Sequence, residues 1–304
     1  MEATCENPMK ELPFKLHDFG ARGVSSYESA GIGGAAHLVN FMGTDTLGAL
    51  SILKEYYGAE KMPGFSIPAS EHSTICSWGR EGEADAYYNM VEAFGKPGAI
   101  LACVSDSYNI FEAVRDIWCS EDMKANIRDK GCTVVIRPDS GHPPTVVLQI
   151  LEILEVKFGM YTNKKGYRVL NDGFRLIQGD GINLEMIETI LQQMKDRGYS
   201  AENIAFGMGG GLLQCLNRDT LSFAMKTSAV RRNGKWIPVG KQPVTDKYKS
   251  QKKGRLTLRQ NESGKWHTST DRSWQDKNLL WPAFINGVIR SYPVLDDIRE
   301  RAAV

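Results

Sequence analysis

Residues 133–141 read TVVIRPDSG, a short apolar run that passes directly into arginine, aspartate, serine and glycine. The prolines at 143–144 then suit the start of a helix, where a missing N–H costs nothing. The same order of strand, polar or glycine cluster and helix occurs four more times. The other instances are FSIPASEH (65–72), ILACVSDS (100–107), FRLIQGDG (174–181) and NIAFGMGGG (203–211). Loops after parallel strands share the face that holds the active site, so the pattern predicts an α/β enzyme.

This alternation defines the expected elements. Strands are predicted near 65–68, 99–104, 132–137, 174–178 and 203–207. Helices are predicted near 25–39, 43–57, 81–94, 108–118, 143–157, 183–197 and 293–302. The start of the chain is unusual, because residues 1–14 show neither a strand nor a clear helix pattern before HDFGARG.

Beyond Gly211 the pattern changes to β-like segments at 221–230, 235–239 and 255–259, with a turn at Asn233-Gly234. We expect a smaller antiparallel layer there, beside an α/β barrel that 304 residues are enough to form. The expected domains are a lead-in at 1–16, a barrel-like domain at 17–220 and a β-rich layer with a C-terminal helix at 221–304.

Composition limits the function classes. The chain is 42% hydrophobic and 24% charged, as in ordinary globular proteins, and its net charge of +1 gives no case for general nucleic-acid or membrane affinity. The six cysteines form no CxxC pair or metal-ligand spacing, which indicates a reducing compartment. No signal peptide or membrane-spanning run is visible, so we expect a cytoplasmic protein.

The glycine cluster GMGGG at 207–211 follows an apolar strand and precedes a helix-like segment. Glycines let backbone amides approach an anion, and Arg218 offers a counter-charge, so a phosphate site is predicted. The alternative is a flexible turn. The spacing matches neither a dinucleotide fingerprint nor a P-loop.

Two further strand ends carry sugar-binding chemistry. In RPDSG, Asp139 is suited to accept hydrogen bonds from ribose hydroxyls while Arg137 meets a phosphate or carbonyl. An Arg–Asp pair that merely closes the loop is the alternative. In QGDG, Gly179 permits close approach and Asp180 accepts from a sugar, although a plain Asp-Gly turn explains the same residues.

His72 stands beside Glu71 at the end of a predicted strand. A histidine there can act in acid–base catalysis or capture a phosphoryl group, and a structural role is the alternative. In HDFGARG, we expect Phe19 to stack on a flat ring and Arg22 to contact phosphate. The lysine-rich loop 241–255 reads as a solvated face, from which Lys241 and Lys249 could reach a polyphosphate in a neighbouring subunit. No metal cluster stands out, and Mg2+ would arrive with phosphates.

Taken together, several segments resemble the nicotinamide phosphoribosyltransferases, which are type II phosphoribosyltransferases. The matching segments are KLHDFGARGVSS, HLVNFMGTDT, SIPASEHST, VSDSYN, VIRPDSG, IQGDG, IAFGMGGGLLQ and KKGRLTL, in order over about residues 10–300. The resemblance implies an incomplete, TIM-like α/β barrel with a β-rich layer, working as a homodimer. It implies phosphoribosyl transfer from 5-phosphoribosyl 1-pyrophosphate (PRPP) to nicotinamide in NAD salvage, with Mg2+ and with ATP hydrolysed through a phosphohistidine.

The resemblance also assigns roles to residues. Phe19 would stack on nicotinamide, Arg22 would lie near ring and phosphate, and Asp45 would accept from the carboxamide NH2, with Ser105 nearby through water. The ribose contacts would be Arg137, Asp139, Gly179 and Asp180. The 5-phosphate contacts would be Gly209, Gly210 and Arg218. His72 would be phosphorylated, and Lys241 and Lys249 would reach the partner subunit's phosphates. The catalytic set would be His72, Asp139 and Arg137.

The chain departs from the family in two ways. Family members are longer at the N-terminus, including strands of the β-rich layer and a tyrosine that stacks on nicotinamide. They also have aspartate where this chain has Asn109, so we expect weaker support for a charged His72. We hypothesise that the chain keeps the ligand contacts as a fragment, as one piece of a split enzyme or as a weakly active protein. The alternatives are a nicotinate phosphoribosyltransferase, disfavoured by Asp45, and a non-catalytic partner.

Overall fold

The computed structural model describes residues 1–221, 223–245, 247–270 and 278–303, which divide into two compact units. Unit 1 comprises residues 1–216 and the segment from Pro293 onward, and unit 2 comprises residues 217–292. The predicted β-rich domain included the C-terminal helix, whereas the structure places that helix in unit 1. It packs there because Leu295 joins a buried cluster and the Arg299 guanidinium donates to the Leu38 carbonyl at 2.7 Å.

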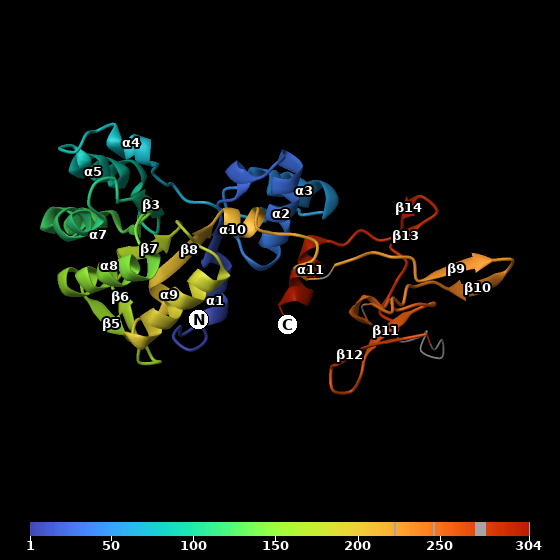
Figure 1. Cartoon of the computed structure of the whole chain (residues 1–304). Coiled ribbons are helices and arrows are strands. Elements are labelled where there is room, and N and C mark those ends of the chain that lie inside the picture. Colours follow the sequence, from blue (N-terminus) through green and yellow to red (C-terminus); the bar gives the residue numbers. More distant parts are fainter. Residues whose placement is uncertain (222, 246, 271–277, 304) are drawn as a thin grey trace. The chain divides into compact units, whose positions relative to one another are not determined.

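Unit 1 is built on a six-stranded sheet in the order β2-β1-β8-β7-β4-β3, with every neighbouring pair parallel. Figure 1 labels three of these strands, β3, β7 and β8. The strands are β1 (Leu16–Asp18), β2 (Gly43–Thr44), β3 (Ile100–Val104), β4 (Thr133–Arg137), β7 (Phe174–Gln178) and β8 (Ile204–Met208). The predicted strands near 99–104, 132–137, 174–178 and 203–207 are confirmed. Because all six run in one direction, the loops after them emerge at one edge of the sheet.

The two faces of the sheet carry side chains of different size, as strand alternation requires. On β4, Val134 and Ile136 belong to the large hydrophobic cluster, while Val135 between them faces the other way. That other face is lined mostly by smaller side chains. Its members are Ala102, Val135, Ile177 and Ala205, with Phe19 and Ile67 against them. The face with the larger side chains therefore forms the main core, and the opposite face carries a smaller apolar cluster.

Helices and a hairpin cover the face of the sheet that carries the larger side chains. They are α5 (Glu83–Phe94), α6 (Ile110–Glu112), a π-helix η3 (Ala113–Trp118), α7 (Glu121–Lys130), α8 (Pro143–Lys157), α9 (Leu184–Asp196) and the strands β5 (Met160–Thr162) and β6 (Arg168–Leu170). Local sequence explains several boundaries: Pro143 stands in the first turn of α8, and the Asn183 side chain caps α9. Helix α7 and the β5–β6 hairpin were not predicted.

A second group of helices packs together with the C-terminal helix. These are α2 (Tyr27–Asn40), α3 (Leu47–Tyr56) and α11 (Leu295–Ala302), around the buried side chains of Leu38, Leu53 and Leu295. Helix α2 begins at Ser26, whose hydroxyl accepts from the backbone of Ser29. Shorter elements of unit 1 are α1 (Pro8–Glu11), η1 (Leu12–Phe14), η2 (Ala21–Gly23), α4 (His72–Cys76), η4 (Ala201–Asn203) and α10 (Gly210–Leu213).

Two sequence expectations about strands are wrong. No strand was predicted at the start of the chain, but Leu16–Asp18, which overlaps the first two residues of HDFGARG, forms β1 between β2 and β8. Residues 65–68 do not form a regular strand. Instead Phe65 makes a single parallel bridge with Gly43, and Ala69 makes one with Ala102. Pro68 has no N–H to continue a ladder, so this segment contacts both edges of the sheet only briefly.

Unit 2 consists of two-stranded antiparallel sheets. The pairs are β9 (Ala229–Arg232) with β10 (Lys235–Pro238), β11 (Thr257–Gln260) with β12 (Trp266–Ser269), and β13 (Phe284–Ile285) with β14 (Val288–Ile289), and η5 covers Lys247–Lys249. The predicted turn at Asn233-Gly234 is confirmed, since both residues have positive φ. The segment predicted at 221–230 becomes a strand only from Ala229, and residue 222 lies outside the described residues. Throughout the described chain, every helix is too short or too polar to cross a bilayer.

Candidate active site

The loops that follow five strands of the sheet line one cavity of about 1180 Å3 in unit 1. They follow β1, β2, β4, β7 and β8, whose carboxyl ends meet at the same edge. Of the predicted site residues, nine line this cavity: Phe19, Arg22, Asp45, Arg137, Asp139, Gly179, Asp180, Gly209 and Gly210. Residues separated by up to 191 positions in the sequence (19 to 210) are thus brought around one space.

The ring of Phe19 forms one wall and is held by close neighbours. A Cβ on Gly207 would lie 1.9 Å from the ring, and a Cβ on Gly179 would lie 3.3 Å from it, so glycine at 207 is required for this packing. The Arg137 guanidinium lies over the ring, 5.6 Å from its centroid. Phe19 is therefore a fixed apolar surface with a cation beside it, suited to a flat polar ring.

Asp45 reaches the same cavity from the loop after β2. Its carboxylate accepts a hydrogen bond from the Ser66 hydroxyl at 2.6 Å, and its backbone N–H donates to the Asp18 carbonyl at 3.0 Å. The neighbouring loop after β1 is tied down by Asp18, whose carboxylate accepts from the Gly20 N–H at 2.8 Å. Asp45 thus has a defined position and a carboxylate that can accept further hydrogen bonds.

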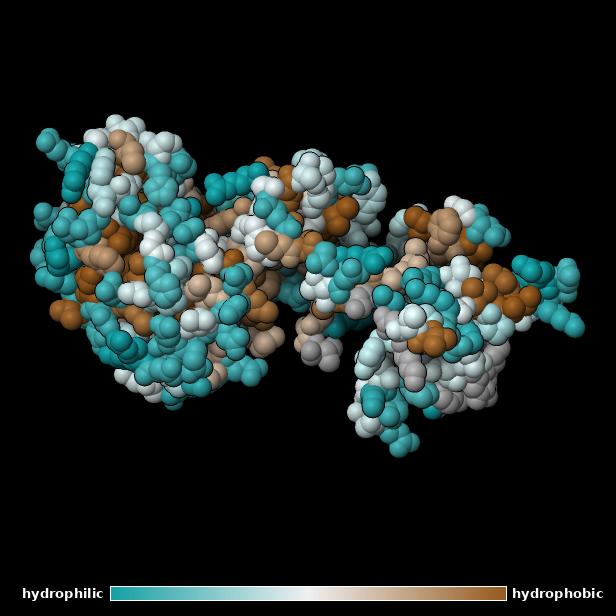
Figure 2. All heavy atoms as spheres, in the orientation of Figure 1, coloured by the Kyte–Doolittle hydropathy of each residue, from teal (hydrophilic) through white to brown (hydrophobic). Residues whose placement is uncertain are grey.

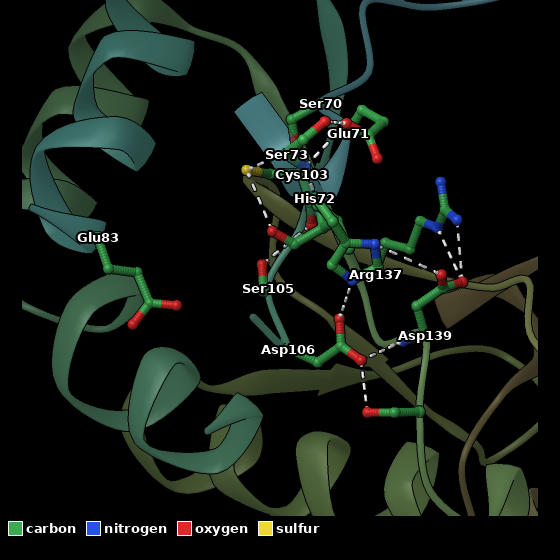
Figure 3. Close-up of polar contacts among 12 residues, drawn as sticks. Ser70, Glu71, His72, Ser73, Glu83, Cys103, Ser105, Asp106, Arg137 and Asp139 are labelled. Carbon is green, nitrogen blue, oxygen red and sulfur yellow. Dashed lines mark hydrogen bonds and ion pairs between the residues drawn. The ribbon is translucent and has the colours of Figure 1, made fainter. Parts of the chain in front are cut away.

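Arg137 and Asp139 form an ion pair at 2.9 Å within the loop after β4 (Figure 3). The sequence analysis gave this ion pair as an alternative to ligand binding. Both residues also line the cavity, so the ion pair does not exclude contact with a ligand. Asp139 in turn lies 3.8 Å from Nδ1 of His72, while Nε2 of His72 lies 2.9 Å from Asp106 (Figure 3). His72 itself does not line the cavity but borders a residue that does.

The glycine cluster at 209–211 closes the cavity near the start of α10. The Gly209 carbonyl accepts from the backbone N–H of Leu213, and Gly210 lies against the side chain of Gln214. A Cβ on Gly211 would stand 2.8 Å from the Ile182 carbonyl, so the close approach of these two segments requires glycine there. The cluster is a packed part of the site rather than a flexible turn.

Besides His72, four predicted site residues are not among those that line the cavity. Ser105 is buried in the core, where its hydroxyl donates to the Cys103 carbonyl at 2.9 Å and accepts from Trp118 Nε1 at 3.0 Å. Arg218, Lys241 and Lys249 belong to unit 2. There Arg218 pairs with Asp219 at 2.9 Å, and the backbone of Lys241 pairs with that of Gln251. Within unit 1, the structure thus brings nine of the predicted residues to one cavity but not Ser105.

The position of Asn109 differs from the expectation that it faces His72. Its side-chain oxygen accepts from the backbone N–H groups of Phe111 and Glu112 and caps α6. The carboxylate beside His72 comes from Asp106 instead, three residues earlier in the same loop. The substitution of aspartate by asparagine at position 109 therefore leaves His72 with an acidic neighbour.

Sequence reasoning missed several residues of the site. Asp106 and Ser66 contact predicted residues directly, and Glu185, Gln214 and Cys215 line the cavity. A signal for Asp106 was present, because it ends the strand motif ILACVSDS. No comparable signal marks the others. Within the described ranges, no group of three or more His, Cys, Asp or Glu side chains could hold a metal ion.

Comparison with known proteins identifies the family of the chain. The profile of the nicotinate phosphoribosyltransferase (NAPRTase) family matches residues 14–278, so the chain belongs to this family. It is similar to the nicotinamide phosphoribosyltransferase of Xanthomonas campestris pv. campestris, with 55% identity over 88% of this chain and 57% of the relative. The corresponding protein of Mycoplasma pneumoniae is 37% identical over 80% of this chain and 53% of the relative.

A third relative extends the match. The nicotinamide phosphoribosyltransferase of Acinetobacter baylyi is 32% identical over 94% of this chain and 60% of the relative. Among solved structures, a putative nicotinate phosphoribosyltransferase from Saccharomyces cerevisiae matches 69% of this chain and 50% of its own, with 16% identity and a TM-score of 0.46. The chain therefore spans between about half and three fifths of the length of the curated relatives it matches.

Proposed function

We propose that this chain carries the substrate site of a nicotinamide phosphoribosyltransferase, which joins nicotinamide to PRPP and releases nicotinamide mononucleotide and pyrophosphate in NAD salvage. The observation that carries the proposal is the single cavity where an aromatic wall, carboxylates, arginines and a glycine cluster meet. Named relatives share up to 55% of the aligned residues. Because they are longer, the activity is proposed for the whole protein to which this site belongs.

The base would lie against Phe19, between its ring and the space that Asp45 borders. Asp45 would accept a hydrogen bond from the carboxamide NH2, and the Ser66 hydroxyl orients the carboxylate for that contact. Nicotinate has a carboxylate in place of the amide, so Asp45 would repel it. The preference for the amide would thus follow from the charge of Asp45 alone. Arg22, at the cavity wall, would face the phosphate side of the substrate.

The ribose and phosphate would occupy the other side of the cavity. Asp139 and Asp180 would accept from ribose hydroxyls, Arg137 would neutralise negative charge, and Gly179 allows close approach. The backbone amides at Gly209 and Gly210 would face the 5-phosphate. Arg218, Lys241 and Lys249 of unit 2 remain proposed phosphate contacts, the lysines reaching a partner subunit, and these roles rest on the family resemblance alone.

The reaction is a displacement at the anomeric carbon. Nicotinamide nitrogen forms the new bond as the bond to pyrophosphate breaks, and positive charge develops on the sugar between them. The protein groups would hold both reactants in line and stabilise the leaving charge, which is the main source of acceleration for such a step. Arg137 stands beside both Phe19 and Asp139, so one cation can serve base and sugar together.

The cofactors are also proposals. Mg2+ would neutralise pyrophosphate charge and would arrive with the phosphates, since Asp180 offers one carboxylate at the cavity but no protein cage surrounds it in the described chain. ATP would act as a coupled substrate through phosphorylation of His72. Its ring is part-exposed and lies beside Asp139, which supports this role.

The architecture supports an incomplete, TIM-like barrel. Residues 65–70 bridge to both edge strands of the six-stranded sheet, and small side chains line its inner face. A homodimer is supported by the many exposed apolar side chains of unit 2, which an assembly interface would cover. A cytoplasmic location fits the six free cysteines.

A competition assay tests the proposal. Purified chain is mixed with PRPP, Mg2+, ATP and equal amounts of nicotinamide and nicotinate, and both mononucleotides are measured by mass spectrometry. We expect nicotinamide mononucleotide to dominate. In Asp45→Asn the repulsive charge is gone, so the preference should fall by about 10- to 100-fold, the value of one charge-assisted hydrogen bond. Dominant nicotinate product from the unmodified chain would instead show a nicotinate phosphoribosyltransferase.

The remaining alternative is a non-catalytic partner. It predicts no product from the chain alone and none after addition of the N-terminal half of a longer relative. Product that forms only with the added half would support a split enzyme, and product from the chain alone would show that the site is sufficient.

A further inference from the structure

The side chain of Gln214 lies where two loops of the cavity meet. One loop follows β8 and carries the glycine cluster at 209–211, and the other follows β1 and carries Arg22. Gln214 itself also lines the cavity. Its backbone N–H donates to the Gly210 carbonyl at 2.9 Å, so the residue has a fixed place at the end of α10.

Two glycines show how closely the Gln214 side chain approaches both loops. A Cβ on Gly23 would lie 1.6 Å from the amide nitrogen, so the amide occupies space that only glycine leaves open. On the other loop, the amide oxygen lies 3.2 Å from the position of a Cβ on Gly210. This reach is expected, because residues four apart share one face of a helical turn and side chains tilt toward its N-terminus. The amide therefore contacts the glycine cluster and the backbone next to Arg22 at once.

The amide of Gln214 is free to bind a ligand. The residue is exposed, and among the residues that the structure describes no group forms a hydrogen bond with its side chain. Its terminal bond rotates easily, so the NH2 group can turn to the cavity and offer two N–H donors. Phosphate oxygens accept such bonds, and an uncharged amide does not repel them. These properties fit a phosphate group that the backbone of the glycine cluster would hold from another side.

We propose that Gln214 is a further substrate-binding residue. Its side-chain amide donates to the phosphate of the phosphoribosyl group and joins the Arg22 loop to the glycine cluster in one phosphate subsite. This rests on the proposed function, which places the 5-phosphate at Gly209 and Gly210. The competing role is a spacer that only fills the space beside Gly23. A spacer has no preference for phosphate, whereas a donor does.

Two variants remove the amide contact from different segments of the chain. Gln214→Ala deletes the side chain at an exposed position. Gly23→Ala keeps Gln214 but puts a methyl group where its amide lies, so the flexible side chain has to move away. The φ of Gly23 lies outside the left-handed region, so alanine fits its backbone. Gln149→Ala is the matched control, because Gln149 is an exposed glutamine of α8 that does not line the cavity.

The experiment is calorimetric titration of the full chain with ribose 5-phosphate and with nicotinamide. We expect Gln214→Ala and Gly23→Ala each to weaken ribose 5-phosphate binding by about 10-fold, the lower end for a hydrogen bond to a charged group. Nicotinamide affinity should not change. The double variant should bind ribose 5-phosphate as Gln214→Ala does, because Gly23→Ala then has no amide to displace. Gln149→Ala should bind both probes as the unmodified chain does.

A third variant separates the donor from the spacer. Gln214→Glu keeps the size of the side chain but replaces the NH2 donor with a negative charge. A spacer tolerates this change, whereas a phosphate contact does not. We therefore expect ribose 5-phosphate affinity to fall by about 100-fold, more than in Gln214→Ala, because repulsion adds to the lost hydrogen bond. Gln149→Glu controls for the change in net charge.

Three results would overturn the proposal. Unchanged ribose 5-phosphate affinity in Gln214→Ala and Gln214→Glu would show a spacer. Equal losses for ribose 5-phosphate and nicotinamide would show general damage to the cavity. No ribose 5-phosphate binding by the unmodified chain would show that the cavity has no phosphate subsite. Failure of the proposed function has a different signature: no chain forms nicotinamide mononucleotide, while the selective loss of ribose 5-phosphate affinity still supports the role of Gln214.

Discussion

Units 1 and 2 contain similar apolar residues but differ in how many of them they bury. Unit 1 buries Trp118, Tyr87 and Phe174 within one large cluster against the sheet. In the described part of unit 2, only Gly254 and Thr257 are buried, and residues such as Met225 and Val244 are almost fully exposed. Figure 2 shows hydrophobic atoms on the surface around β9, β10, β13 and β14.

The difference shows what each unit requires for stability. A parallel sheet with helices packed on one face forms a hydrophobic core with them, and its loops can hold a site in fixed geometry. Two-stranded hairpins bury little by themselves and are marginal in water. Unit 1 is therefore expected to fold without help from another surface and to hold its site in place. Unit 2 is expected to need another surface that covers its apolar side chains.

The largest expected effect comes from a matched pair of tryptophans. Trp118 is fully buried, stacks on Tyr87 with ring centroids 4.7 Å apart and donates to Ser105, whereas Trp266 in β12 is 59% exposed. Trp118→Ala should lower the free energy of unfolding by about 3–5 kcal/mol, because it removes a packed ring and leaves a cavity. Trp266→Ala should change it by about 0.5 kcal/mol or less.

Denaturant unfolding followed by far-UV circular dichroism measures this difference, since α5, α8 and α9 all lie in unit 1. Losses of equal size in the two variants would mean that unit 2 has a core comparable to that of unit 1. The two units would then not differ in how they bury their apolar residues.

Thiol reactivity distinguishes buried from exposed positions within unit 1, which holds all six cysteines. Burial raises the pKa of Cys103 to about 12 and that of Cys119 to about 11, so few reactive thiolates form there. Cys76 and Cys215 are exposed. With a thiol reagent at mildly alkaline pH, those two should react first and the four buried cysteines only on unfolding.

Mass spectrometry of the labelled peptides checks this order. Cys215 also lines the cavity, so PRPP should slow its labelling and leave Cys76 unaffected, which makes Cys76 the internal control. Rapid labelling of Cys103 in the folded chain would show that the core of unit 1 opens more easily than its packing indicates.

Part of this fold could be predicted because its signals are local. Strands β3, β4, β7 and β8 are continuous apolar runs that end at glycines or polar residues, and buried parallel strands are expected to read this way. Strand β1 has three residues and one clear apolar position, so no periodicity marks it. Helix α7 is mostly polar and buries only Met123 and Ile127, one turn apart, which is too weak a pattern to detect.

The site residues also divide into those that the sequence predicted and those that depend on contacts between loops. Phe19, Asp45 and Asp180 were predicted from strand ends and from family resemblance, and the structure brings them to one cavity. The contact of Asp106 with His72 joins residues 34 positions apart through the geometry of two loops, and no spacing rule contains that distance. Asn109 was expected near His72 from the family resemblance, whereas its side chain caps α6.

The smallest expected effect is the response of unit 1 to mild acid. Burial lowers the pKa of His37, whose Nε2 lies 2.9 Å from the Gly43 carbonyl, and it also lowers the pKa of His17. Both groups take up protons more readily in the unfolded chain than in the folded one. The free energy of unfolding should therefore fall as the pH drops through the ordinary histidine value of 6.5, and the loss should end below the folded-state pKa values.

His37→Gln should make this pH dependence shallower, because glutamine can still donate to the Gly43 carbonyl but does not titrate. Urea unfolding across the mildly acidic range measures the slope for each chain. If the variant and the unmodified chain lost stability in parallel, His37 would not be the source. Because His17 belongs to β1 and His37 is bonded to β2, a confirmed change of slope would show that the edge of the sheet beside Asp45 is part of the cooperative core.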